Sequence, residues 1–134
     1  MSEIITDKLT GKTSAGDVTI TSEGGSATMQ LQQGLAKGWM LLNCSTAAIT
    51  DDFNFSSISD INTGTFTCTF SSSMANATYV TTGSGSDESS GPTVYVVHPS
   101  DTKTTSQITV RALDRTGTRY DSTKMEFAIH GDLA

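Results

Sequence analysis

The chain has 134 residues and a mass of 14.1 kDa, which suits one domain with a short appendage. Its net charge of −6 and its pI of about 4.6 argue against a nucleic-acid partner, because phosphate binding needs a basic patch. Hydrophobic residues make up 35% and charged residues 16%, whereas 18 Ser and 23 Thr supply much of the remainder. Such a Thr-rich, charge-poor composition is typical of short β-strands joined by tight turns.

The N-terminus is polar, and no long apolar stretch follows it, so we expect neither a signal peptide nor a membrane-spanning segment. The few Lys and Arg residues are scattered and form no basic helix that would bind a membrane surface. We therefore expect the protein to be made in, and to stay soluble in, a cytoplasm, with later assembly into a particle left open.

Two segments with alternating apolar residues come first, at 17–21 and 27–32, and a Gly-Gly turn separates them. Gly supplies the positive φ that a hairpin loop needs, so we expect a β-hairpin over 17–32. Because a lone hairpin is marginal in water, it must pack on the main domain or on another copy of itself. We expect residues 1–38 to form an attachment and trimer-organising segment. The candidates for subunit-interface residues are Ile4, Ile5, Val18, Ile20, Met29, Leu31 and Trp39.

Further apolar or alternating segments recur about every ten residues, and none predicts a helix longer than a turn or two. In 65–70, the clearest of them, Phe66, Cys68 and Phe70 share one face of a strand. The expected strands are 35–43, 47–50, 53–58, 65–71, 79–82, 93–97, 107–113 and 124–130. We expect an all-β fold, in which an antiparallel, jelly-roll-like β-sandwich of about eight to ten short strands occupies 39–134. Residues 60–64 have the chemistry of a turn, and 83–92 that of a mobile loop.

The sequence shows no arrangement typical of an enzyme or a metal centre. His98 and His130 stand outside any metal-ligand spacing, and no G-x-S-x-G elbow is present. Acidic residues at 51–52, 87–88, 114 and 121 lack the spacing of a calcium loop, so we expect solvated turns there. We expect no enzymatic activity, no metal and no cofactor.

The cysteines and aromatic residues have more than one interpretation. A disulfide between Cys44 and Cys68 is geometrically possible, but two buried free thiols fit their apolar surroundings and the missing secretory signal. Trp39, Tyr95 and Tyr120 could stack against sugar rings if exposed. We expect Trp39 to lie in the core or at a subunit interface, and Tyr120 to be exposed in a polar loop.

Distinctive motifs follow Trp39 in a fixed order. They read DFNFSSISD at 52–60, TGTFTCTF at 63–70 and MANATYV at 74–80. In these motifs, and in its last two strands, the chain resembles a knob domain of tailed-bacteriophage structural proteins, particularly tail fibres of marine and cyanobacterial phages. The resemblance covers 39–131, and its motifs are structural rather than catalytic.

The resemblance implies a virion protein, usually a homotrimer, whose β-sandwich knobs recognise a host surface through variable loops. Only 38 residues precede the knob, so the expected form is a short fibre; the alternatives are a capsid or tail decoration or adaptor without receptor contact, and a lectin-like carbohydrate-binding module. The expected partners are further copies of the chain, other virion proteins through residues 1–38, and a host glycan or protein. The candidates for receptor contact are Asp87, Glu88, Tyr95, His98, Asp101, Lys103, Arg115, Arg119 and Tyr120.

Overall fold

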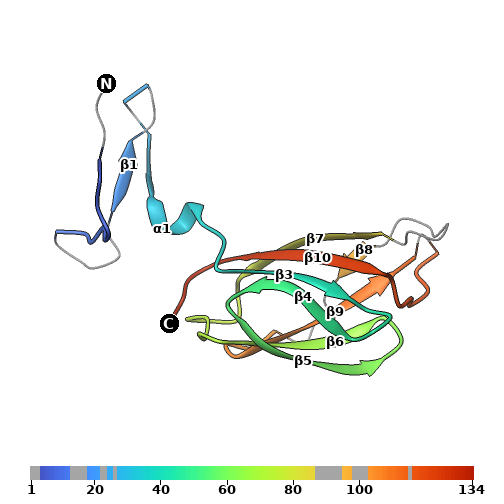
Figure 1. Ribbon diagram of the computed structural model, residues 1–134. Coiled ribbons are helices and arrows are strands. Elements are labelled where there is room, and N and C mark those ends of the chain that lie inside the picture. Colours follow the sequence, from blue (N-terminus) through green and yellow to red (C-terminus); the bar gives the residue numbers. More distant parts are fainter. Residues whose placement is uncertain are drawn as a thin grey trace. The chain divides into compact units, whose positions relative to one another are not determined.

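The structure is a computed structural model that describes residues 4–12, 18–21, 24–25, 27–86, 95–97, 103–114 and 116–134. Over these residues the chain is nearly all β, and its antiparallel sheets pack together, which confirms the expected all-β sandwich (Figure 1). The chain separates into two compact units, Met1–Leu35 and Ala36–Ala134. The division lies three residues before the boundary expected from the sequence.

The first unit contains the expected hairpin. Strands β1 (Thr19–Thr21) and β2 (Thr28–Gln30) are antiparallel, and Ile20 lies directly opposite Met29. The expected second strand is shorter than predicted, because residues Leu31–Gly34 form the one-turn helix α1. The N–H of Leu31 donates to the carbonyl of Val18 at 2.7 Å, directly beyond the paired residues. Beyond this residue the two-stranded sheet offers no strand that could pair with the backbone. A helical turn therefore supplies hydrogen bonds to the backbone groups of this segment from within the segment itself.

The second unit is a sandwich of two four-stranded sheets (Figure 1). In spatial order, the first sheet contains β4 (Ala48–Phe53), β3 (Gly38–Asn43), β10 (Lys124–His130) and β7 (Val80–Ser86). The second contains β5 (Phe55–Asn62), β6 (Thr65–Phe70), β9 (Gln107–Leu113) and β8 (Tyr95–Val97). All neighbouring strands are antiparallel. The strands that the alternating sequence pattern predicts are therefore present. Which sheet each strand joins is set by the tertiary structure.

Strand ends differ from the predictions where a neighbouring strand offers hydrogen bonds. β7 continues to Ser86, inside the segment expected to be a loop, because it pairs with β10 as far as Lys124. β5 likewise continues to Asn62 along β6, so the expected turn at 60–64 shrinks to Thr63 and Gly64. The rest of the expected mobile loop, residues 87–92, lies outside the described residues.

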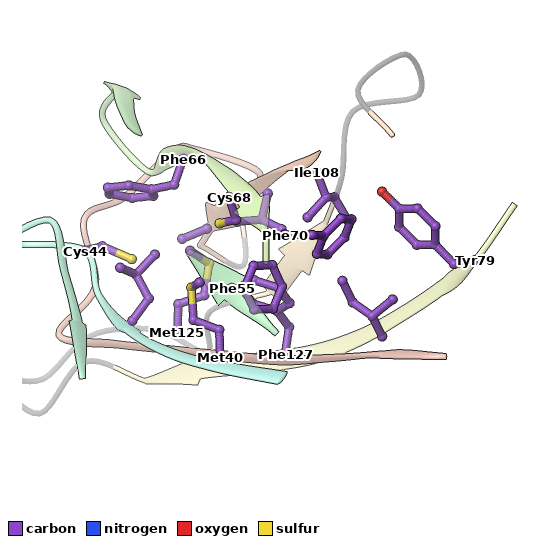
Figure 2. Close-up of a cluster of buried hydrophobic side chains, with 14 of the residues drawn as sticks. Met40, Cys44, Phe55, Phe66, Cys68, Phe70, Tyr79, Ile108, Met125 and Phe127 are labelled. Carbon is purple, nitrogen blue, oxygen red and sulfur yellow. The ribbon is translucent and has the colours of Figure 1, made fainter. Parts of the chain in front are cut away.

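The core lies between the two sheets, where the inward residues of each strand meet (Figure 2). The alternation predicted for β6 is confirmed, since Phe66, Cys68 and Phe70 are all buried. The ring of Phe70 contacts that of Phe55 at 5.1 Å between centroids and that of Tyr79 at 5.7 Å. Such tilted and edge-to-face pairs add stability beyond the apolar area that they bury. Cys44 and Cys68 are free and buried, and burial raises the pKa of the Cys68 thiol to about 12.

Candidate functional site: the outer face of the β4-β3-β10-β7 sheet

Side chains on two central strands alternate between the core and the outer face of the first sheet. On β3, Met40 and Leu42 are buried while Trp39 is 39% exposed. On β10, Phe127 is buried while Glu126 is exposed. Trp39 therefore does not belong to the core, and that part of its expectation was wrong. The amphipathic pattern of these strands places their second set of side chains on the face turned away from the core.

The strand register arranges the outer residues in two rows that run across the sheet. One row consists of Phe53, Trp39, Ala128 and Thr82, from β4, β3, β10 and β7 in turn. The next row consists of Asp51, Leu41, Glu126 and Ser84. Side chains directly opposite each other on adjacent strands lie within contact distance. The rows therefore join residues as far apart in the sequence as Trp39 and Ala128 into one continuous surface.

A hollow of about 570 Å³ lies over these rows. Its size falls within the range of about 300–1,000 Å³ that is usual for small-molecule sites. The hollow has a simple cause, because the row that contains the large Trp39 continues into the smaller side chains of Ala128 and Thr82 on the next two strands. The lining residues are Trp39, Met40, Leu41, Asp51, Thr82, Gly83, Ser84, Glu126, Phe127 and Ala128.

The polar groups of the hollow are mainly hydrogen-bond acceptors. The hydroxyl of Ser84 donates to Oε1 of Glu126 at 2.8 Å, which orients that carboxylate across the two strands. Oδ1 of Asp51 accepts the N–H of Asp52 at 2.9 Å. Two carboxylates thus lie beside an exposed indole ring, and the described lining residues include no Lys or Arg. The hollow is suited to a ligand that offers apolar surface and hydrogen-bond donors.

The receptor-contact candidates within the described residues do not converge on this hollow. Lys103 is half-buried, and its Nζ donates to the carbonyl of Tyr79 at 2.8 Å and lies 5.2 Å from that ring's centroid. Arg119 donates to Oδ1 of Asn62 at 2.8 Å. Tyr120, expected to be exposed, is half-buried and packs against the core. That expectation was wrong because the N–H of Tyr120 donates to the carbonyl of Ala112 at 3.1 Å, which holds the segment against β9.

The remaining receptor-contact candidates are distributed between one strand and the undescribed segments. Tyr95 lies in β8, opposite Leu113. The candidates outside the described residues are Asp87, Glu88, His98, Asp101 and Arg115.

The interface candidates of the first unit are largely exposed. Ile4 and Ile5 are 83% and 87% exposed, and Met29 is 53% exposed. Ile20 is also exposed, whereas Val18 and Leu31 are half-buried. Large apolar side chains therefore remain in contact with solvent in this unit.

Of the acidic residues expected in solvated turns, Asp51 and Asp52 instead lie in strand β4, whereas Asp114 and Asp121 lie outside the strands and accept backbone N–H groups. Oδ1 of Asp121 accepts the N–H of Gly64 at 2.6 Å, from a residue 57 positions away. Oδ1 of Asp114 accepts the N–H groups of Thr116 and Thr118, each at 2.8 Å. These carboxylates stabilise turns. Within the described parts of the chain, no group of three or more His, Cys, Asp or Glu side chains could hold a metal ion.

No protein-family model matches the chain, and neither a curated protein nor a solved structure matches it. Among the described residues, no helix has the length and apolar character that a membrane crossing requires.

From the sequence, Trp39 is expected to be able to stack on a sugar, whereas neither Glu126 nor Ser84 is predicted as a site residue. Both lie in strands, and neither belongs to a recognisable motif. The sequence feature that could have indicated Glu126 is the alternation along β10, which places its side chain on the sheet face opposite to that of its buried neighbours. That signal indicates the outer face, but the proximity of Glu126 to Trp39 depends on strand pairing.

Proposed function

We propose that the chain is a non-enzymatic, homo-oligomeric structural protein of a bacteriophage virion, whose sandwich unit contributes to host-surface recognition. The observation that carries the assembly part is the exposure of the first unit, in which none of the described residues is buried. Its large exposed apolar side chains are Ile4, Ile5, Leu9, Ile20, Met29 and Leu35. The virion assignment is supported by the resemblance over residues 39–131, all of which lie in the sandwich unit.

The hairpin of the first unit suits association between copies. Ile20 and Met29 are directly opposite each other on one face and are 45% and 53% exposed. Burial of a fully exposed side chain of this kind stabilises by about 1.5–3 kcal/mol, so each half-exposed residue still has about half of that to gain, and three or more copies that cover this face gain several such contributions. Among the described residues, β1 and β2 form a sheet of only two strands, which leaves a backbone edge on each for pairing with another copy.

Light scattering on a sizing column tests the assembly. The expected mass is about three times the chain mass of 14.1 kDa. The double variant Ile20→Ser/Met29→Ser is expected to dissociate at micromolar concentrations while the sandwich keeps its circular dichroism spectrum and thermal midpoint. The matched control, Thr21→Ala/Thr28→Ala, changes the adjacent cross-strand pair on the other face and should remain oligomeric. A monomeric unmodified protein would refute the assembly proposal.

Two further measurements separate the alternatives for the role in the virion. Mass spectrometry of gradient-purified phage particles should detect peptides of this chain, and a chain found only in the unassembled fraction would contradict the virion role. Purified protein should also adsorb to host cells. If the chain is present in particles but shows no adsorption, it is a decoration or adaptor protein rather than an adhesin.

A further inference from the structure

We infer that the outer-face hollow beside Trp39 binds a pyranose glycan that is neutral or carries amino groups. This inference names the ligand class and the site for the adhesion role proposed above, and it rests on that role. It places the recognition of the host surface on the outer face of a sheet, whereas the expectation from the sequence is recognition through loops. The residues that carry it are Trp39, Asp51, Ser84 and Glu126.

The exposed indole supplies the apolar part of such a site. A pyranose ring presents C–H groups on one side and hydroxyl groups around its edge. The electron-rich face of an aromatic ring attracts those C–H groups, so the sugar can stack on the indole. Trp39 is 39% exposed although its strand neighbours on either side, Gly38 and Met40, are buried. A large aromatic side chain exposed in the middle of a sheet therefore has surface available for this contact.

The neighbouring strands leave room for a ring beside the indole. Ala128 follows Trp39 in its row on β10, and Thr82 follows on β7. The distance from β3 to β7 is two interstrand spacings, or about 10 Å. Small side chains across that distance form the floor of the hollow, and Trp39 stands at one side of it. A sugar on this floor would also meet the polar groups of the next row.

The polar groups match the edge of a sugar. Glu126, held by the Ser84 hydroxyl at 2.8 Å, and Asp51 present carboxylate oxygens that accept hydrogen bonds from sugar hydroxyl groups. Hydrogen bonds to charged acceptors are stronger than those between neutral groups. An ammonium group on an amino sugar would gain an additional attraction. Phosphorylated, sulfated and uronic-acid glycans are disfavoured, because the described lining residues supply two carboxylates and no Lys or Arg.

A second copy of the chain that docks on this face through the same patch fits less well than a glycan does. In a two-fold contact the same patch lies on both sides of the interface. Such a contact would bring Asp51 and Glu126 of each copy toward the same two carboxylates of the other, which costs several kcal/mol for close like charges. A hollow is filled only by a partner with a protruding surface. Two identical hollows that face each other would leave an empty space between the copies.

Three substitutions test the site. Trp39→Ala removes the platform and is expected to weaken glycan binding about tenfold or more, whereas Trp39→Phe keeps an aromatic ring and should bind within a few-fold of the unmodified protein. Phe53→Ala is the matched control, because Phe53 is a 50% exposed aromatic in the same row that does not line the hollow. It should leave binding unchanged. Glu126→Gln should weaken binding of amino glycans more than that of neutral glycans.

The 134-residue chain in its oligomeric form is applied to an array of pyranose glycans with neutral, amino and uronic-acid members, and hits are titrated by calorimetry. Trp39 is the only tryptophan, so a saturable change in fluorescence on addition of a bound glycan reports on the hollow directly. Binding confined to neutral or amino glycans, and lost in Trp39→Ala but retained in Phe53→Ala, supports the inference. Thermal unfolding of each variant confirms that the sandwich is intact.

Other outcomes overturn the inference and separate its failure from that of the proposed function. Glycan binding that Trp39→Ala leaves unchanged overturns the site, while the adhesion role stands. Host adsorption without any glycan binding overturns the ligand class alone. If neither occurs, both the inference and the adhesion role fail. Self-association that Trp39→Ala and Phe53→Ala both abolish, without glycan binding, identifies the face as a subunit interface and overturns the inference.

Discussion

Gly64 occupies a position where the structure leaves no room for a side chain. Its φ is +61°, in the left-handed region, and it is the second residue of the turn between β5 and β6. A Cβ atom there would lie 2.7 Å from the carbonyl oxygen of Ala112 and 2.7 Å from the nitrogen of Tyr120. All the obstructing atoms belong to backbone, which cannot move aside as a flexible side chain does. The substitution Gly64→Ala is therefore expected to distort the packing of this turn against β9.

The expected loss of stability has two parts. A non-glycine residue in the left-handed region costs about 1–2 kcal/mol. Relief of the clash must also disturb the hydrogen bonds from Ala112 N–H to the Gly64 carbonyl, 2.8 Å, and from Tyr120 N–H to the Ala112 carbonyl, 3.1 Å. Each such bond contributes about 1 kcal/mol. Gly64→Ala should lower the free energy of unfolding by about 3–4 kcal/mol, a large fraction of the ~5–15 kcal/mol typical of a domain.

Gly117 provides the matched control. Its φ is also positive, +83°, but a Cβ atom there would have no heavy atom within 4 Å. Gly117→Ala should therefore lose only the conformational part, about 1–2 kcal/mol. Urea unfolding followed by circular dichroism measures both variants, and the difference between them isolates the clash. If Gly64→Ala unfolds within 0.5 kcal/mol (roughly the error of the method) of Gly117→Ala, the argument that the surrounding backbone is rigid is refuted.

Two further predictions concern a hydrogen bond from backbone to an exposed carboxylate and two buried titratable groups. Asp121→Ala removes the acceptor of the Gly64 N–H and should lower the free energy of unfolding by about 1–2 kcal/mol, whereas Asp121→Asn keeps a side-chain oxygen and should lose less; equal urea midpoints for the two variants would contradict this role. Burial raises the pKa of the Cys68 thiol from 9.0 to about 12, and burial likewise raises the pKa of the Tyr79 hydroxyl from 10.0 to about 12. The unfolded chain therefore releases these protons at lower pH than the folded chain, so their contribution is complete below pH 9 and is lost as the pH rises toward 12. Thermal midpoints measured from pH 7 to 11 should fall in that window, and the fall should be smaller in Cys68→Ala and in Tyr79→Phe; the same fall in all three proteins would show that other groups cause it.

The local sequence determined which segments are strands and which of their faces is buried. The segment 65–70 alternates apolar and hydroxylated residues with the period of the pleat, and its apolar face is the one that packs in the core. The same reasoning predicted the strands near 107–113 and 124–130. These predictions succeed because the two-residue period is a property of neighbouring residues, whatever the rest of the chain does.

The tertiary structure alone decided which outward-facing residues become neighbours and which polar groups form hydrogen bonds with each other. Trp39, Glu126 and Ser84 lie on three strands that are far apart in the sequence, and their proximity follows from the order and register β3-β10-β7. The sequence indicates that Asp121 lies in an exposed loop, but only the fold shows that its carboxylate accepts the N–H of Gly64. Periodicity gives the side of a strand on which a residue lies, but not its neighbours across the sheet. That pairing is set when the two sheets close over a common core, and a shift of one residue would reverse every side chain of a strand.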